Sequence, residues 1–378
     1  MGRASLGLLL LLLFCLFQLP YASAAETKTA GAQKTQKSVK KKPVKKTRKA
    51  AVAKRRSAKS AKSTRAVRNV VAKRRVAVSR KAGRVRTAKA KASRSHRTAA
   101  APVFSAAHLA GLGSTADPLG LNASAVFVVD ESDGEILFEK NADFALPIAS
   151  LTKLMTALVV VEAGQDMQEI LEVTSEDIDR IKGTSSRLPI GARLSRTDML
   201  HIALMSSENR AASALGRNYP GGLRAFAAAM NAKARELGMT DSNFIEPTGL
   251  SSFNVASARD LSKLVAAASE HPLLAKYSTH GKYAVDVGRS QLQYVNSNRL
   301  VGRDDWDIGL QKTGYIREAG RCLVMHVTIE ERPVVMVFLD ADASAHRITD
   351  ANRMREWVID QMNREAATVQ AMLEGGQG

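Results

Sequence analysis

The stretch LPIASLTKLMTALVVVEAG, residues 146–164, places a serine and a lysine three positions apart at the start of an apolar helix. Pro147 favours the start of a helix, Ser150 is a good capping residue, and apolar side chains recur at helical spacing until Gly164 ends the pattern. Because positions i and i+3 lie on one helix face, the Lys153 ammonium can reach the Ser150 hydroxyl. The stretch therefore fits both a nucleophile with its base and an ordinary capped helix.

Two further short motifs follow along the chain, Ser207-Glu208-Asn209 and Lys312-Thr313-Gly314. The patterns S-x-x-K and S-x-N also occur elsewhere in the sequence, so neither is specific by itself, whereas K-T-G occurs once. The three motifs are separated by about 60 and then about 105 residues, and such an ordered set is typical of serine enzymes of the β-lactamase and penicillin-binding type. Order and spacing together favour catalysis over three unrelated structural motifs.

Four blocks of the chain resemble serine-type D-alanyl-D-alanine peptidases: PIASLTKLMTALVV, MSSENRAASALGR, EPTGLSSFNVASARDL and QKTGYIREAGRCLVM. The resemblance covers about residues 124–365 and is to the low-molecular-mass penicillin-binding proteins, above all their type-7 group of D-alanyl-D-alanine endopeptidases. It implies a β-lactamase/transpeptidase-like α/β (α+β) fold, an antiparallel sheet flanked by helices with a helical subdomain. It also implies peptidoglycan peptides as substrates and β-lactams as covalent inhibitors.

The resemblance assigns the chemistry to four residues. Ser150 would attack the carbonyl between D-residues and form an acyl-enzyme. Lys153 would accept the serine proton, which requires a pKa well below the usual value of about 10.4. We expect partial burial and the positive charge of Lys312 to lower it. Ser207 would relay a proton to the leaving amine, and Asn209 would hold Lys153 and a substrate amide.

The K-T-G motif and the residue after it are implied to bind the substrate. Lys312 and Thr313 would engage a carboxylate of the substrate, and Gly314 would let the substrate backbone lie against its strand. The backbone N–H groups of Ser150 and Tyr315 would form the oxyanion hole. No metal ion or organic cofactor is expected, and the seven histidines form no H-E-x-x-H pair.

The first 24 residues have the pattern of a secretory signal peptide. A positive residue near the start precedes an apolar run from Leu6 to Phe17 and a small-residue cleavage site at residues 22–24. The apolar run is short for a membrane span, although a retained anchor is the alternative. We therefore expect export to the periplasm without a transmembrane anchor. Cleavage removes Cys15 and leaves Cys322, which we expect to be a small buried strand residue.

The net charge of +20 is divided sharply along the chain. Residues 26–100 carry 28 Lys or Arg and one acid, giving +27; residues 101–378 carry 27 basic and 35 acidic residues, giving −8, and Arg3 supplies the remaining +1. Residues 25–100 lack Phe, Trp and Tyr, so we predict a disordered tail. The tail is either a tether to anionic envelope polymers or a solvated spacer. Export and the lack of stacking aromatics argue against nucleic acid.

After a linker predicted at residues 101–120, the pattern becomes globular. Strands are predicted at residues 125–130 and 135–140, helices follow in the middle of the domain, and four later strand patterns are KYAVDV, DIGLQKTG, RCLVMHVTIE and PVVMVFLDA. A final helix is predicted from about Arg347 to Glu365. Strands at both ends with helices between them favour an antiparallel sheet with a helical insertion. The domain should span residues 121–366, with a C-terminal tail at 367–378.

Three other interpretations lead to different functions. A class A β-lactamase needs E-x-x-L-N after S-x-N, but the chain has EPTGL at residues 246–250, with Leu250 where the asparagine should be. A D-alanyl-D-alanine carboxypeptidase is the nearer alternative. Such relatives usually carry a second β-rich domain and an amphipathic anchoring helix, and the sequence after residue 365 is too short for either, which favours the endopeptidase. A non-catalytic wall-binding protein is the third.

Overall fold

The computed structural model describes residues 104–375, which contain all four of the blocks quoted above. The predicted signal peptide, the whole predicted N-terminal tail and the first three residues of the predicted linker lie outside these residues, as do the last three residues of the chain. No helix within the described part is both long enough and apolar enough to span a membrane.

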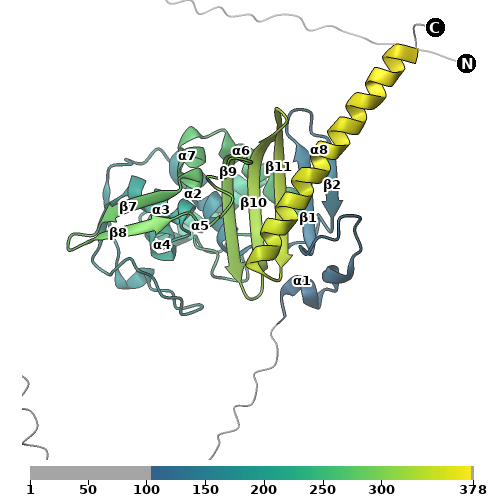
Figure 1. Cartoon of the computed structure of the whole chain (residues 1–378). Coiled ribbons are helices and arrows are strands. Elements are labelled where there is room, and N and C mark those ends of the chain that lie inside the picture. The colour runs from purple at the N-terminus through teal and green to yellow at the C-terminus, as the bar shows by residue number, and fades with distance from the viewer. Residues whose placement is uncertain (1–103, 376–378) are drawn as a thin grey trace, which may run out of the picture. The chain divides into compact units, whose positions relative to one another are not determined.

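A five-stranded antiparallel sheet forms the centre of the structure (Figure 1). Its strands lie in the order β2-β1-β11-β10-β9, with bounds β1 Ala125–Asp130, β2 Ile136–Lys140, β9 Asp307–Ile316, β10 Gly320–Ile329 and β11 Arg332–Ala341. The two ends of the domain meet because β1 pairs with β11, with Ala125 opposite Leu339. This arrangement confirms the predicted antiparallel sheet, and β9, which carries K-T-G, is an edge strand.

The chain between β2 and β9 supplies the helical insertion that was predicted. Its helices are α2 Thr152–Glu162, α3 Arg196–Met205, α4 Asn209–Arg217, α5 Gly222–Glu236, α6 Ala258–Ser269 and α7 Pro272–Thr279. Short strand pairs connect them: β3 Leu146–Pro147 with β6 Val255–Ala256, β4 Ile170–Glu172 with β5 Arg193–Ser195, and β7 Lys282–Asp286 with β8 Gln291–Val295. The remaining helical elements are α1 Ala106–Leu109, α8 Ser344–Gly375 and the 3₁₀ turns η1 Leu112–Ser114, η2 Ala149–Leu151 and η3 Ser175–Asp177.

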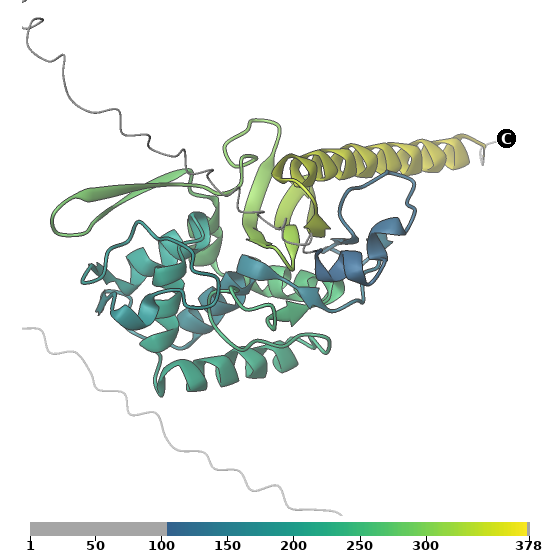
Figure 2. The ribbon, with the colours of Figure 1, turned by 90° about the horizontal axis from the view of Figure 1, so that it is seen from below.

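The central sheet carries an apolar layer on each face because successive strand residues point to opposite sides. Along β1, Ala125 and Phe127 belong to the core shared with α6 and the helical insertion, whereas Val126 and Val128 belong to the core beneath α8. Figure 2 shows α8 on one side of the sheet and the helices from the middle of the chain on the other. Cys322 is buried in the first of these cores, as predicted.

Helix α2 is buried on nearly every side rather than along one face. Its residues from Thr152 to Val160 are all buried. Ser150 lies in η2, before the helix, and Leu151 takes the N-cap position without a side-chain hydrogen bond, so the predicted serine cap is wrong. Gly164 follows the helix with φ +62°, as expected for a terminating glycine. The Ser150 hydroxyl therefore serves the site and not the helix end.

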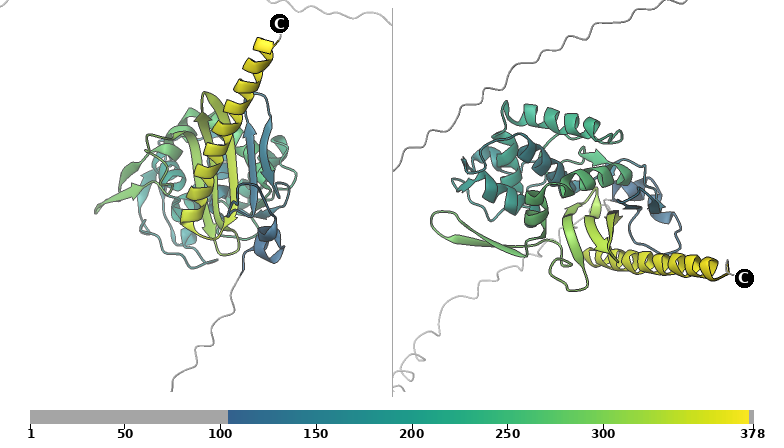
Figure 3. Two further views of the ribbon diagram at one scale, coloured as in Figure 1. Left: turned by 45° about the vertical axis from the view of Figure 1, so that its right-hand side comes forward. Right: turned by 90° about the horizontal axis from the view of Figure 1, so that it is seen from above.

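Two elements extend from the body of the domain in opposite directions, the β7–β8 hairpin and the C-terminal part of α8 (Figures 1 and 3). The sequence predicts that the last helix ends at Glu365, but α8 continues to Gly375. Residues 367–375 therefore belong to the helix and are not a separate tail. Their apolar side chains are exposed, including Val369, Met372 and Leu373.

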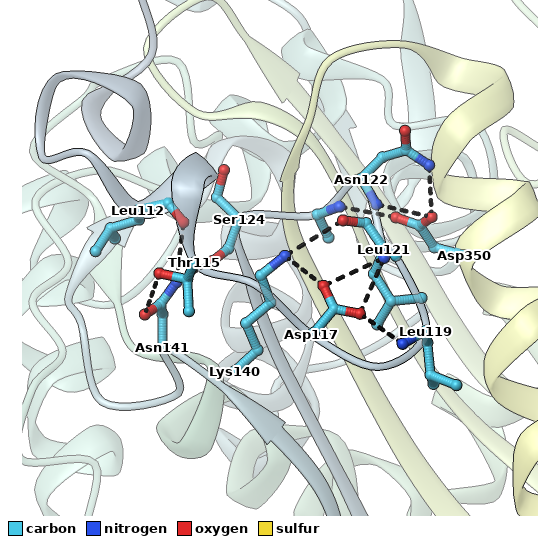
Figure 4. Close-up of polar contacts among 12 residues, drawn as sticks. Leu112, Thr115, Asp117, Leu119, Leu121, Asn122, Ser124, Lys140, Asn141 and Asp350 are labelled. Atoms are coloured by element: carbon cyan, nitrogen blue, oxygen red, sulfur yellow. Dashed lines mark hydrogen bonds and ion pairs between the residues drawn. The ribbon is translucent and has the colours of Figure 1, made fainter.

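Residues 104–120, which the sequence predicts to be part of a linker, pack against the sheet. Asp117 pairs with Lys140 of β2 at 2.8 Å, both side chains being almost inaccessible to solvent, and the same ammonium donates to the Leu121 carbonyl (Figure 4). Asp350 of α8 accepts hydrogen bonds from the backbone and side-chain amides of Asn122. Polar contacts thus fasten this segment to β2 and the residues directly after it to α8, and the folded part begins before residue 121.

Candidate active site

The nucleophile candidate Ser150 lies in a strained turn that two glycines approach closely. Ala149, in the same turn, has φ +49°, a left-handed conformation that is costly for a residue other than glycine. A Cβ atom on Gly249 would lie 1.8 Å from the Ala149 carbonyl oxygen, and one on Gly314 would lie 3.2 Å from the Ser150 nitrogen. The loop at Gly249 and strand β9 can therefore hold the turn only because both positions lack a side chain.

Lys153 places its ammonium at the centre of the site. The side chain is buried, and Nζ donates to Ser150 Oγ at 2.9 Å, to Asn209 Oδ1 at 2.8 Å and to the Thr248 carbonyl at 2.6 Å. These acceptors use all three protons of the ammonium. The structure thus brings together three of the predicted catalytic residues and adds a carbonyl that the motifs did not indicate.

The two lysines of the site have lowered pKa values for related reasons. Burial lowers the pKa of Lys153 to about 8, while nearby carboxylates, led by Glu246, oppose the fall. The pKa of Lys312 lies well below its ordinary value because of burial and the positive charges of Lys153 and Arg347. The expected burial of Lys153 is therefore confirmed, and the repulsion between the two buried ammonium groups favours loss of a proton from the pair. Lys153 can exchange a proton near neutral pH.

Ser207 and Lys312 form a second hydroxyl–ammonium pair in the site. Lys312 is buried, and its Nζ donates to Ser207 Oγ at 2.9 Å and to the Thr313 carbonyl at 2.9 Å. Ser207 has φ +62° and is thus another left-handed residue that is not glycine. The Thr313 hydroxyl shares a hydrogen bond with Ser297 Oγ at 2.7 Å. Two residues predicted to bind substrate are therefore already oriented by neighbouring groups of the protein.

The S-x-N motif is fastened to the loop at residues 184–186. Asn209 begins α4, and its Nδ2 donates to Thr184 Oγ1 at 3.2 Å. Glu208 caps the same helix, and its carboxylate also accepts from Ser186 Oγ at 2.7 Å. The sequence motif assigns no role to its middle residue, so this anchoring contact of Glu208 is visible only in the structure.

The loop of residues 246–250 is the part of the site that the motif analysis missed. The Glu246 carboxylate accepts the backbone N–H groups of Thr248 and Gly249, each at 2.7 Å, and so shapes the carbonyl that holds Lys153. Glu246 lines a smaller neighbouring pocket and not the cleft that contains Ser150. Its carboxylate is engaged by the amides of its own loop, which fits a supporting role. In the sequence, Gly249 was the one residue of this loop that could have indicated its close approach to the nucleophile turn.

The site opens into a cleft of about 670 Å³. Ser150, Ser207 and Asn209 line it together with Tyr315, whose side chain is half exposed and lies against the Arg321 guanidinium, 3.6 Å from the ring centroid. The loop at 181–184 and the end of β9 complete the walls. Within residues 104–375, no three His, Cys, Asp or Glu side chains are grouped so that they could hold a metal ion. The cleft can accept a peptide whose carbonyl reaches the Ser150 hydroxyl.

Comparisons with known proteins agree with this geometry. A family model described as D-alanyl-D-alanine carboxypeptidase, Peptidase S11, matches residues 113–343, which contain all three motifs. The D-alanyl-D-alanine endopeptidase of Pseudomonas aeruginosa is 45% identical over 240 residues, covering 63% of this chain and 77% of the relative. The structure of Streptomyces K15 DD-transpeptidase has a TM-score of 0.60 at 23% identity, covering 64% of this chain and 98% of its own. Penicillin-binding protein D2 from Listeria monocytogenes, in the cefotaxime-bound form, has a TM-score of 0.55 at 29% identity, covering 62% and 96%.

Proposed function

Because the chain belongs to the Peptidase S11 family of D-alanyl-D-alanine carboxypeptidases, we propose that it is a serine peptidase that hydrolyses D-alanyl cross-links of peptidoglycan as an endopeptidase. The observation that carries the mechanism is the buried Lys153 amine, 2.9 Å from Ser150 Oγ and held by Asn209 and the Thr248 carbonyl. In this arrangement the base is positioned before substrate binds, which lowers the entropic cost of the reaction.

Acylation begins when neutral Lys153 accepts the Ser150 proton. Ser150 Oγ bonds to the D-alanyl carbonyl carbon while the carbonyl electron pair moves to oxygen, where the backbone N–H groups of Ser150 and Tyr315 stabilise the charge. The C–N bond breaks as the carbonyl re-forms. Ser207 donates its proton to the leaving amine and regains one from Lys312, its hydrogen-bond partner. Lys153 passes its proton to solvent and then takes one from the water that attacks the ester carbonyl; it returns this proton to Ser150 Oγ as the C–O bond of the ester breaks, and Lys312 regains its proton from solvent.

Lys312 and Thr313 would receive the carboxylate next to the scissile bond on the leaving side. The pKa of Lys312 is well below its ordinary value when only the protein's own groups surround it. A bound carboxylate favours the protonated lysine and so raises that pKa. Substrate binding would therefore supply the protonated Lys312 that the proton relay requires. Gly314 would let the substrate backbone approach β9.

The endopeptidase is favoured by the 45% identity to a relative of that name, and the carboxypeptidase remains the second candidate because the family description names it. Residues 25–378 should be offered purified cross-linked muropeptide dimers and pentapeptide monomers, with Ser150→Ala as the control. Chromatography with mass spectrometry resolves the products. Conversion of dimers to monomers supports the endopeptidase; release of terminal D-alanine alone makes the protein a carboxypeptidase and contradicts the proposal.

The N-terminal segments give this enzyme a location and an attachment. Residues 1–24 would direct export to the periplasm and be removed, in keeping with a substrate that lies in the cell wall. The 28 basic residues of the tail would then bind anionic envelope polymers by charge. The sequencing of the mature N-terminus after secretion tests the export step. A chain that retains residues 1–24 contradicts it.

A further inference from the structure

An ion pair lies across one end of the catalytic cleft. Lys182 comes from the loop after η3, and Glu318 comes from the turn between β9 and β10, 136 residues later. Their charged groups are 2.5 Å apart, and both side chains are partly exposed, at 26% and 33%. Both residues line the cleft that contains Ser150, so a substrate in the cleft would lie beside the pair.

Glu318 has a binding capacity that the protein leaves unused. One carboxylate oxygen, Oε1, accepts from Lys182, whereas Oε2 is buried and has no partner among the described residues. Burial raises the pKa of Glu318, but the Lys182 ammonium and a backbone N–H outweigh it and lower the pKa, so the group is charged. A buried anionic oxygen without a donor is unfavourable. Rotation of the carboxylate about its last side-chain bond would turn this oxygen toward the cleft, where a ligand N–H group would satisfy it.

The order of residues along β9 shows which part of a substrate would reach this pair. Lys312 and Thr313 precede Gly314, which lies against the nucleophile turn, and Glu318 follows four residues later. β9 is an edge strand, so an extended peptide can lie along it. If the leaving-side carboxylate binds Lys312 and Thr313, as the proposed function requires, the acyl side of the substrate runs toward Glu318.

We propose that Lys182 and Glu318 form an acyl-side subsite for a zwitterionic amino-acid head group on the residue that precedes the scissile D-alanine. The substrate ammonium binds the unused oxygen of Glu318, and the substrate carboxylate binds the Lys182 ammonium. The free end of a diaminopimelate residue in a peptidoglycan stem has this chemistry. The ion pair between Lys182 and Glu318 thus keeps each side chain near the position in which it would meet the opposite charge of the substrate.

A substrate can engage this ion pair at low cost. Pairs between partly exposed side chains contribute little to stability, because water solvates both partners well. A ligand that carries both charges keeps each protein charge neutralised and adds a donor for the unused oxygen. A ligand with one charge leaves one protein group without a new partner. The subsite should therefore distinguish a zwitterion from a single charge.

Four cross-link mimics test this inference. They share one D-alanyl amide and one leaving group, and the preceding residue is diaminopimelate, lysine, α-aminopimelate or norleucine, which present a zwitterion, an ammonium, a carboxylate and no charge. We expect kcat/KM of the wild type to be at least about tenfold higher for diaminopimelate than for norleucine, as one or two charge-assisted contacts would give. Equal values for the four peptides would overturn the proposal.

Variants assign each charge to its partner. Glu318→Gln should lower kcat/KM about tenfold more for the peptides that carry the side-chain ammonium than for those that lack it. Lys182→Gln should lower kcat/KM about tenfold more for the peptides that carry the side-chain carboxylate than for those that lack it. The exchange Lys182→Glu with Glu318→Lys rebuilds the ion pair in the opposite orientation. If the subsite binds as proposed, this double variant should still fail to prefer the diaminopimelate peptide over the norleucine peptide. Full recovery with diaminopimelate would show that the pair only braces the loop.

Benzylpenicillin acylation of Ser150 separates this proposal from the proposed function on which it rests, because penicillin has no diaminopimelyl head group. A wild type that acylates and cleaves all four peptides equally keeps the proposed function and loses the subsite. A folded wild type that neither acylates nor cleaves any peptide overturns both. The exposed pair Arg303–Asp305 provides a matched control, and Arg303→Gln should not change the preference.

Discussion

Among single residues, Lys153 sets the pH dependence of the reaction. Its pKa of about 8 leaves a minority of molecules with the neutral base at pH 7. The acylation rate with benzylpenicillin should therefore rise about tenfold per pH unit below 8 and level off above it. Stopped-flow measurement from about pH 6 to about pH 9 checks this expectation, with Ser150→Ala showing no covalent labelling. A rate independent of pH would contradict the role of Lys153 as base.

Glu246 acts on the same lysine through its charge. Its carboxylate is the largest of the charges that oppose the fall in the pKa of Lys153. Glu246→Gln keeps an oxygen for the loop amides but removes the charge, so that the pKa should fall and the acid limb of the rate profile should move to lower pH. Glu236→Gln, on the exposed face of α5, is the matched control and should leave the limb in place. If the acid limb of the rate profile does not move in Glu246→Gln, then Glu246 only shapes its loop and does not set the pKa of Lys153.

Among elements, the contact between the 246–250 loop and η2 depends on Gly249. Gly249 and Gly238 both have positive φ, +79° and +67°, so an alanine at either position carries a similar backbone strain of about 1 kcal/mol. A Cβ atom at 238 meets nothing within 4 Å, whereas one at 249 overlaps the Ala149 carbonyl. Gly249→Ala should therefore lower the free energy of unfolding by about 2 kcal/mol more than Gly238→Ala does, and it should displace Ser150. Urea unfolding and penicillin acylation measure both effects, and equal behaviour of the two variants would contradict the argument.

The Asp117–Lys140 pair joins the N-terminal segment to β2. Burial raises the pKa of Asp117, but Lys140 and backbone amides outweigh it and lower the pKa. Lys140→Met would leave a buried carboxylate unpaired and should lower the free energy of unfolding by about 3–5 kcal/mol at neutral pH. Because the folded-state pKa is depressed, the stabilisation is lost as the pH falls through it, so the difference should shrink below about pH 4.

Denaturant unfolding of wild type, Lys140→Met and the double variant with Asp117→Asn checks this expectation. The double variant should recover part of the loss, since it no longer carries the buried charge. Arg303→Met breaks an exposed pair and should have no measurable effect. A Lys140→Met protein as stable as the wild type would show that the segment is held by its apolar contacts alone.

At the scale of the whole molecule, a tail of charge +27 is attached to a domain of charge −8. A tether that acts by charge should bind anionic cell-wall sacculi at low salt and release them at about 0.5 M salt, where the screening length is only a few ångströms. Co-sedimentation of residues 25–378 and of residues 101–378 with sacculi measures this difference. Equal sedimentation of the two chains at low salt would make the tail a spacer.

The correct predictions came from patterns that are local in the chain. The alternation in AVFVVD and the strand runs after residue 306 predicted strands that the structure confirms, and the left-handed Gly164 ended its helix as expected. The wrong predictions concerned segments whose state depends on distant partners. Ser150 is not a cap because η2 precedes α2, and residues 104–120 are folded because Lys140 and Asp350 hold them and the segment that follows.

The sequence by itself determined most of the strands and helices, the three motifs and the expected chemical class of the site, because these depend on residue type and on spacing along one helix or strand. Only the tertiary structure decided the burial that lowers the pKa of Lys153, the Thr248 carbonyl that holds it and the Lys182–Glu318 pair across the cleft. The physical reason is that desolvation and charge act through space. Groups 95 and 136 residues apart in the chain become neighbours only when the sheet and the helical insertion pack together.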